Sequence, residues 1–305
     1  ASADYAQDVS ISDNILKQVS DAYRRFRNTF RFLLGNLSDF DDQTNAISNW
    51  DDLEPIDQYM MAKTAQLLSD VEQAYDSFKF NGVYRAVYDF VNDLSSVYMD
   101  VTKDRLYSES PDSPRRRAVQ TVLFNILEVL VRVLSPILSF TADEVWECYP
   151  EAMRNREGRV CNVQLAGWPH RSDFVPALPG KAAEDKVLAA FGGALEVRDV
   201  VTKALEDARG AKVINKSQEA TVSVTAPQAT LDALSAFDAS VFEELFIVSG
   251  VTFAAGDELA CEVKPAEGDK CPRCWNYREL GGNANHTDVC QRCGDALDAI
   301  GFTEE

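Results

Sequence analysis

The residues best suited to chemistry are four cysteines near the end of the 305-residue sequence. Cys271 and Cys274 form one C-x2-C pair, and Cys290 and Cys293 form a second pair after fifteen intervening residues. Two residues between cysteines let a tight turn aim both sulfur atoms at one ion about 2.3 Å away, and two such turns complete a tetrahedron. The spacing therefore predicts one structural zinc ion on these four ligands, with no open position for a reacting water.

Other interpretations of the cysteines stay open on spacing alone. The two pairs could be unrelated reduced thiols, they could serve an iron–sulfur or redox centre, or His286 could replace one ligand. An odd total of seven cysteines, four of them in close pairs, indicates a reducing compartment rather than a disulfide framework. We expect Gly294, directly after the second pair, to supply a positive φ. The remaining three, Cys148, Cys161 and Cys261, are expected to be ordinary buried thiols.

The first cysteine pair also carries Arg273 and Trp275. A guanidinium beside an indole is a good surface for stacking unpaired bases, so both are candidate RNA contacts. The alternative is that Trp275 covers the metal and packs against the helices. A zinc ion with four thiolates has a formal charge near −2, and four cations, Lys270, Arg273, Arg278 and Arg292, are expected to surround and offset it.

The element that must position a second candidate surface is a helix predicted over residues 12–37. Its apolar residues recur every three or four positions, which predicts one buried face, with Ser12 as its N-cap. The predicted inward residues are Ile15, Val19, Ala22, Phe26, Phe30, Leu33 and Leu37. The opposite face carries Arg24, Arg27, Asn28 and Arg31, which could contact an anion or could be an ordinary solvated charged face.

The rest of the sequence predicts a mainly α protein. A second helix is expected over residues 55–80, with Phe78 inward and a break at Asn81-Gly82. Further helices are expected over 83–106 and 114–134. A capping box at Thr141 and Glu144 is expected to open a shorter helix. The predicted order is an antiparallel helical bundle (1–150), a connector (151–180), a small α+β domain (181–265) and a zinc module (266–305). In the α+β domain we expect one or two helices over 181–209, strands at 220–225, 245–251 and 262–263, and short helices at 230–237 and 241–245.

Charge and hydropathy limit the possible partners. The net charge of −19 argues against a nucleic-acid partner, yet basic residues gather locally at 24–31, 103–105, 115–117 and 270–292. Three consecutive arginines, Arg115 to Arg117, open a predicted helix, where the helix dipole disfavours them, so either an anionic partner or nearby acids must offset them. The polar N-terminus is not a signal peptide, and the longest apolar run, 122–140, is interrupted by charges and proline. We therefore expect no membrane partner.

Several motifs resemble one known family. RRFRNTFRFLLGNL (24–37), KDRLY (103–107) and LSPILSFTADEVW (134–146) resemble the anticodon-binding domain of class I isoleucyl-, valyl-, leucyl- and methionyl-tRNA synthetases. KCPRCWNYRELGG (270–282) resembles the zinc module at the C-terminus of isoleucyl-tRNA synthetases, a module type also found in formamidopyrimidine-class DNA glycosylases. Taken together, these motifs most resemble the bacterial type of isoleucyl-tRNA synthetase, and the resemblance covers essentially the whole chain.

The resemblance implies a function and a set of site residues. The chain would be the C-terminal, tRNA-binding portion of an isoleucine–tRNA ligase, an ATP-dependent enzyme of protein biosynthesis, cytoplasmic and monomeric, with tRNA(Ile) as partner. The nucleotide-binding signatures of the HIGH and KMSKS types are missing, so the catalytic and editing domains, with the ATP site, would lie outside it and the fragment would be inactive alone. The implied tRNA contacts are Arg27, Asn28, Arg31, Lys103 and Arg105 on the bundle side and Arg273 and Trp275 on the zinc side.

Two rival functions remain from the residues alone. One is a free-standing helical zinc-ribbon module that binds protein or DNA. The other is a hydrolase or lyase, which is disfavoured because no pairing of nucleophile and base is visible. The length of the native protein distinguishes the free-standing module from the tRNA ligase hypothesis, because a ligase would have a nucleotide-binding fold of several hundred residues upstream.

Overall fold

The computed structural model describes residues 1–303, which divide into two compact units. Unit 1 comprises Ala1–Asp100 and Arg117–Glu184. Unit 2 comprises Val101–Arg116 and the chain from Asp185 onward. The architecture is mainly helical with two small sheets, which confirms the predicted fold class. These units do not coincide with the four predicted parts, since unit 2 combines residues 101–116 with the chain after 184. The predicted boundaries at 150, 180 and 265 remain predictions.

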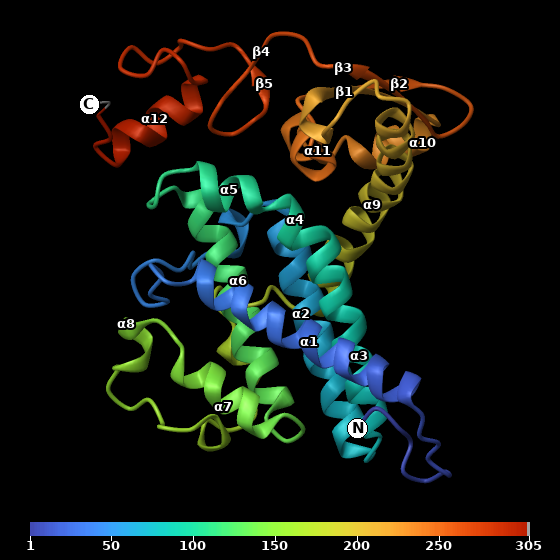
Figure 1. The fold of residues 1–305 in the computed structure, drawn as a ribbon, viewed down its shortest axis with the longest axis vertical. Helices are drawn as coiled ribbons and strands as arrows, with labels where there is room; N and C mark the ends of the chain where they lie inside the picture. The colour runs from blue at the N-terminus through green and yellow to red at the C-terminus, as the bar shows by residue number, and fades with distance from the viewer. Residues whose placement is uncertain (304–305) are drawn as a thin grey trace. The chain divides into compact units, whose positions relative to one another are not determined.

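Unit 1 is a helical bundle. Its centre is α6 (Pro114–Leu134, of which 117–134 lie in this unit), whose side chains are buried on nearly every face, as expected for a helix that is apolar all round. The predicted start at Pro114 is confirmed. The other helices of the unit are α1 (Asp13–Asn36), α2 (Pro55–Asp76), α3 (Phe80–Asp93), α7 (Ser139–Glu147) and α8 (Glu151–Arg154) (Figure 1).

The first helix agrees with its prediction in extent but only partly in burial. Ser12 caps α1 by accepting a hydrogen bond from the backbone N–H of Ile15. The apolar face is buried from Ala22 onward, whereas Ile15 and Val19 are 38% and 37% exposed. The amphipathic pattern is therefore correct, but in the described residues only the second half of the helix rests on the bundle.

The boundary between α2 and α3 lies earlier than predicted. Phe78 adopts a left-handed conformation, with φ of 56°, and its side chain is 66% exposed rather than inward. This turn ends α2, so Asn81 and Gly82 lie in the first turn of α3 instead of breaking a helix. The capping-box prediction at Thr141 is also wrong, because α7 begins at Ser139 and the Thr141 hydroxyl hydrogen-bonds Tyr23 at 3.0 Å.

A π-helical segment, Leu94–Tyr98, follows α3 directly and is continued by α4 (Met99–Val101). The wider turn places Tyr98 in the core, where its hydroxyl donates to a carboxyl oxygen of Asp57 on α2 at 2.7 Å. Both residues are at most 1% exposed. Because both groups are buried, water cannot replace this hydrogen bond if it is lost, so we expect the bond to contribute to the free energy that holds α2 against the π-helical segment.

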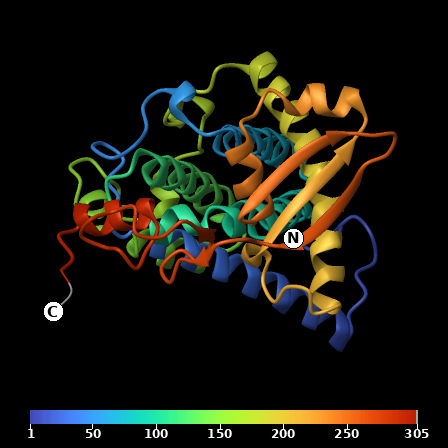
Figure 2. The same cartoon turned by 90° about the horizontal axis from the view of Figure 1, so that it is seen from above.

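Unit 2 contains a sheet of three strands with order β2-β1-β3. Central β1 (Ala220–Ala226) pairs in parallel with β2 (Gly250–Ala255) and antiparallel with β3 (Ala260–Pro265), and Figure 2 shows the three strands side by side. Its alternate residues, from Ala220 to Ala226, are buried, as the sequence pattern predicts. The parallel pair requires a crossover, formed by α10 (Gln228–Leu234) and α11 (Ala239–Phe246).

The remaining elements of unit 2 frame this sheet and the cysteines. A single long helix, α9 (Lys181–Gly210, of which 185–210 lie in this unit), precedes the sheet. The short helix α5 (Lys103–Ser108) contains the KDRLY motif. A two-stranded ribbon, β4 (Asp269–Lys270) with β5 (Tyr277–Arg278), and α12 (Gln291–Ala299) hold the cysteines. The strand predicted at 245–251 is correct only at residues 250 and 251, because α11 continues to Phe246 and a turn separates it from β2, which begins at Gly250. None of the helices among the described residues combines the length and apolarity that a membrane crossing needs.

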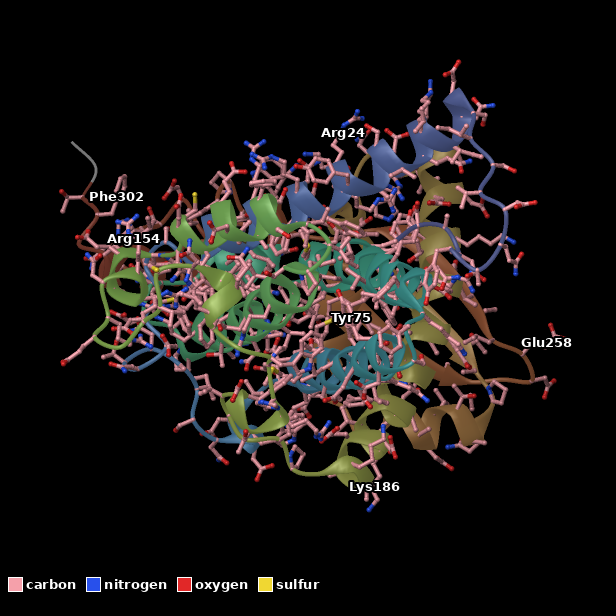
Figure 3. The ribbon with its side chains drawn as sticks, turned by 90° about the horizontal axis from the view of Figure 1, so that it is seen from below. Arg24, Tyr75, Arg154, Lys186, Glu258 and Phe302 are labelled. Carbon is pink, nitrogen blue, oxygen red and sulfur yellow. The ribbon has the colours of Figure 1, made fainter. Side chains whose placement is uncertain are left out.

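The buried Tyr98–Asp57 bond gives a test of the bundle. Tyr98→Phe should lower the free energy of unfolding by about 1–3 kcal/mol, because a fully buried carboxyl group loses a partner. Tyr75→Phe is the matched control: it removes a hydroxyl that donates to the Val133 carbonyl at 2.8 Å, and Tyr75 is only half-buried among the helices (Figure 3). Its cost should be smaller, about 0.5–1 kcal/mol. Urea unfolding of both variants measures the difference, and equal costs would show that the Asp57 bond has no special weight.

Candidate metal centre and nucleic-acid surfaces

The four predicted cysteines come together in unit 2. Their sulfur atoms all lie within 4.8 Å of one another, and all four side chains are buried. The Sγ atoms of Cys274 and Cys290 are 3.8 Å apart. Zinc–sulfur bonds of about 2.3 Å in a tetrahedron place neighbouring sulfur atoms about 3.8 Å apart, so the arrangement fits a tetrahedral metal.

Local structure explains how each pair is aimed. The β4–β5 ribbon brackets the first pair, and within it the backbone N–H of Trp275 donates to the Cys271 carbonyl at 2.9 Å. Cys290 is the N-cap residue of α12, so the second pair sits on the first turn of that helix. Its backbone N–H points at the Cys271 sulfur, 3.5 Å away, which links the two pairs. Val289, Leu280 and Leu297 pack around the cysteines and exclude water.

The glycine prediction needs correction. Gly294 lies inside α12 and does not adopt a positive φ; its need for glycine comes from Asn283, whose Cβ would lie 2.4 Å from an added Cβ. Gly268, Gly281 and Gly301 do have a positive φ, and so does one non-glycine residue of the described metal module, Trp275, at 66°. A non-glycine residue in this region costs of order 1–3 kcal/mol. The first cysteine turn therefore keeps a tryptophan at a position where glycine would be less strained.

His286 does not belong to the metal cluster. The side chain is buried, and its Nε2 lies 3.4 Å from a carboxyl oxygen of Asp298 rather than among the sulfur atoms. The predicted burial of the other three cysteines is wrong: Cys148 and Cys161 are exposed, and Cys261 is half-buried.

Without a metal, the electrostatics favour one charged sulfur atom, that of Cys274, whereas the pKa values of Cys290 and Cys293 are raised. A hydrogen bond from Cys293, with a smaller contribution from the positive charge of Arg292, lowers the pKa of Cys274 to about 4. Burial raises the pKa of Cys290 in the same cluster. Four sulfur atoms this close cannot all be thiolates without a cation, because like charges repel; a divalent metal removes that limit, and its binding releases the protons.

The cations predicted around the metal each have a protein partner. Arg292 donates to both carboxyl oxygens of Asp104 on α5, and Arg273 donates to the Ser108 carbonyl at the end of the same helix. The other two pair with the α+β part: Lys270 with Glu219 at 3.5 Å and Arg278 with Glu243 at 3.7 Å. These contacts attach the metal module to the rest of unit 2, which is a structural role that the sequence did not reveal.

Trp275 is an exposed aromatic residue on the first cysteine turn. Its side chain is 47% exposed, so about half of its surface is open to a ligand, and the alternative, that it covers the metal, stays a prediction. The ammonium group of Lys216 lies 3.8 Å from the indole centroid, and that of Lys270 lies 5.7 Å away. We expected Arg273 beside the indole, but its bond to Ser108 directs it elsewhere. Lys216 was missed because the loop that carries it has no motif.

Two predicted cationic contacts on the KDRLY helix differ in accessibility. Lys103 is exposed on α5. Arg105 is 2% exposed and forms an ion pair with Glu244 of α11, whose other oxygen accepts from Arg115 at 2.8 Å. Arg105 is therefore withdrawn as a phosphate contact, because its guanidinium is enclosed and neutralised. Arg115, at the start of α6, is also bound to Glu109. Nearby acids therefore offset positive charge at this helix start, which was one of the two explanations considered for the three arginines.

The arginine face of α1 lies in unit 1. Arg27 forms a bidentate ion pair with Glu144, at 2.6 and 2.7 Å, and this hydrogen bond is the main cause that lowers the pKa of Glu144. Asn28 and Arg31 are exposed, and among the described residues Arg31 has no ion-pair partner. Arg24 pairs with Asp21 one turn away at the outer side of α1 (Figure 3). Arg31 is thus the α1 arginine most accessible to an anion.

The metal site predicts specific metal dependence. Purified protein should contain one zinc ion per chain, and Cys290→Ser should lower that content sharply because the tetrahedron loses a ligand. Cys148→Ser, an exposed cysteine outside the cluster, is the control and should keep full zinc. Chelation should increase hydrogen exchange around residues 271–293 and leave α2 of unit 1 unchanged. Iron on metal analysis, or full zinc in Cys290→Ser, would show that the site is misassigned.

Comparison with known proteins identifies the chain's relatives. Residues 57–224 match the family described as the anticodon-binding domain of tRNA ligase, and residues 268–295 match the zinc finger found in FPG and IleRS. The second match confirms the zinc prediction and disfavours an iron–sulfur centre.

Curated relatives extend the match to nearly the whole chain. The chain is 43% identical over 307 residues to an isoleucine–tRNA ligase of Geobacillus kaustophilus, covering 96% of this chain and 32% of that protein. It is 39% identical over 312 residues to the isoleucine–tRNA ligase of Syntrophomonas wolfei, covering 97% of this chain and 32% of that protein. The chain thus spans about a third of the length of these relatives. It belongs to the family of anticodon-binding domains of tRNA ligases.

Proposed function

We propose that this chain is the tRNA-binding portion of an isoleucine–tRNA ligase. The observation that supports this most is the match of residues 57–224 to anticodon-binding domains, together with the two curated relatives described above, both named isoleucine–tRNA ligase. In the proposal the partner is tRNA(Ile), and the whole enzyme attaches isoleucine to it at the expense of ATP. The catalytic and editing domains belong to the part of the relatives that this chain does not span. The enzyme works as a monomer in the cytoplasm.

Each unit contributes a candidate RNA surface of its own. In unit 1 it consists of the exposed side chains Asn28 and Arg31, with Arg27 beside them on the same helix face. Long cationic side chains on a helix suit phosphate oxygens, which carry affinity without reading sequence. Arg27 is already neutralised by Glu144, so an RNA phosphate would compete with that carboxylate, and Arg31 is the stronger candidate.

In unit 2 the candidate RNA contacts are Trp275 with the neighbouring Lys216, and separately Lys103 on α5. The backbone of Trp275 is in the left-handed conformation, which costs conformational free energy, and its indole is half exposed. Backbone strain at a surface residue favours a functional role. Base stacking on an aromatic ring tolerates any base, and neighbouring ammonium groups suit the adjoining phosphates. Arg273 supports this surface indirectly, since its bond to Ser108 positions the turn that carries Trp275.

The α1 surface predicts an electrostatic contribution. Arg31→Gln should weaken binding to every tRNA to a similar degree and reduce the slope of log affinity against log salt by somewhat less than one unit, because one phosphate contact is lost. Arg154→Gln, at an exposed arginine on α8, is the charge-matched control. Filter binding at four salt concentrations measures the slope. If both variants behave as the parent does, the face of α1 is an ordinary solvated face.

Trp275 predicts a stacking contribution. Trp275→Ala should weaken tRNA binding by roughly 1–3 kcal/mol and leave the salt slope nearly unchanged. Phe78→Ala is a closely matched control, because Phe78 is also an exposed aromatic residue with a positive φ. Zinc must be measured on the same samples, so that lost metal is not read as lost stacking. A zinc-loaded Trp275→Ala protein that binds tRNA as tightly as the parent would eliminate the stacking role.

A further inference from the structure

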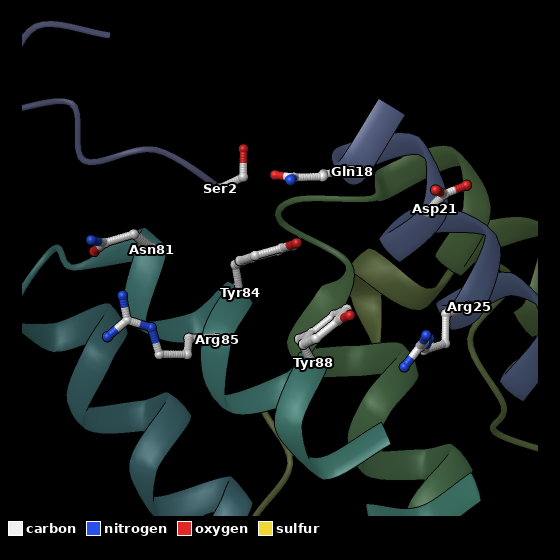
Figure 4. A pocket seen from close by; sticks show the side chains of 8 residues that line it. All are labelled: Ser2, Gln18, Asp21, Arg25, Asn81, Tyr84, Arg85 and Tyr88. Atoms are coloured by element: carbon white, nitrogen blue, oxygen red, sulfur yellow. The ribbon is translucent and has the colours of Figure 1, made fainter. Parts of the chain in front are cut away.

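Unit 1 contains a pocket that shares no residue with the candidate RNA surface on α1. It has a volume of about 600 Å³ and lies between the first half of α1 and the start of α3 (Figure 4). Pockets of roughly 300–1,000 Å³ are the usual size for small ligands. Its lining is polar and aromatic: Ser2, Gln18, Asp21, Arg25, Asn81, Tyr84, Arg85 and Tyr88.

The tyrosines form a rigid aromatic platform. The rings of Tyr84 and Tyr88, one helical turn apart, are stacked with centroids 5.9 Å apart and an interplanar angle of 25°. Buried Phe26 packs edge-on against both rings, at 6.3 and 6.4 Å, and holds them to the core. A platform fixed in this way offers a flat surface for a planar ring at little cost in side-chain entropy.

Two arginines flank this platform. Figure 4 shows the four side chains in a row, with Arg85 beyond Tyr84 and Arg25 beyond Tyr88. The guanidinium of Arg25 lies 5.3 Å from the centroid of Tyr88 and donates to the side chain of Asn92, which leaves several of its N–H groups available. Arg85 is exposed and has no ion-pair partner in residues 1–303.

Opposing charge in the pocket is limited. Asp21 is the one acidic residue in its lining, and Arg24 on the outer side of α1 pairs with it at 3.2 Å. Gln18 and Asn81 add amide groups that can both donate and accept hydrogen bonds. The pocket thus combines cations for a phosphate, flat rings for a base and amides for the edge of that base.

From this combination we propose that the pocket between α1 and α3 binds a nucleoside 5′-monophosphate unit, with its base against Tyr84 and Tyr88 and its phosphate on Arg85. The unit could be a free nucleotide or one unpaired nucleotide of an RNA chain, because both present the same groups. The inference goes beyond the proposed function and does not rest on it, since the pocket shares no residue with the RNA surfaces described above.

The test is titration of the isotope-labelled 305-residue protein with adenosine 5′-monophosphate, followed by transverse-relaxation-optimised NMR. Saturable shifts confined to residues 18–25 and 81–88 are expected. Arg85→Gln should weaken the affinity about tenfold, because a charge-assisted hydrogen bond is lost, and Arg85 has no packing role whose loss would unfold the helix. Arg154→Gln controls for the change in net charge and should leave the affinity unchanged.

Two further probes identify the source of the unit. Inorganic phosphate should bind at least tenfold more weakly than adenosine 5′-monophosphate, because it lacks the base. A short adenylate oligonucleotide that binds more tightly than the mononucleotide assigns the site to RNA, and equal affinity assigns it to a free nucleotide; both support the proposal. No saturable shift with the mononucleotide, or the same affinity in Arg85→Gln, overturns it. A protein that binds tRNA but not the mononucleotide would overturn this inference and leave the proposed function standing.

Discussion

The structure of unit 2 depends on four sulfur atoms held within 4.8 Å of one another. Thiolates this close repel each other unless a divalent cation lies between them, so the fold of residues 271–293 and the binding of metal are one event. A zinc centre with four thiolates has a formal charge near −2, and Arg292, whose positive charge contributes to lowering the pKa of Cys274, is itself bound to Asp104. The metal therefore organises more than its own loop, since its neighbouring cations extend the order to α5.

A second constraint connects α5 with the sheet of unit 2. Arg105 is buried and shares Glu244 with Arg115, so a carboxylate on α11 holds two cations from the segment 101–116. Removing one partner of such a group leaves a buried charge uncompensated, which is strongly destabilising. The KDRLY motif thus has a structural explanation: its arginine and its aspartate anchor the helix through Glu244 and Arg292, whereas its lysine is exposed.

Sequence reasoning was most accurate where a local rule decides the structure. The cysteine spacing predicted the metal ligands, Ser12 and Pro114 marked the starts of two helices, and the alternation over 220–225 predicted β1. It failed where a distant residue decides. Nothing near Arg105 in the sequence indicates Glu244, and nothing near Gly294 indicates Asn283, so one arginine was misread as a surface contact and one glycine as a turn residue. The exposure of Ile15 and Val19 could not be predicted either, because a periodic pattern identifies an apolar face but not what covers it.

The central claim is that this chain recognises tRNA as the anticodon-binding portion of a tRNA ligase. The most direct measurement is a filter-binding competition in which labelled tRNA(Ile) bound to the chain is displaced by unlabelled tRNA(Ile) or by total tRNA depleted of it. If the account is right, tRNA(Ile) displaces the label at a concentration at least tenfold lower than the depleted mixture does. Equal displacement by both competitors, or no binding of tRNA(Ile) by zinc-loaded protein, would contradict it.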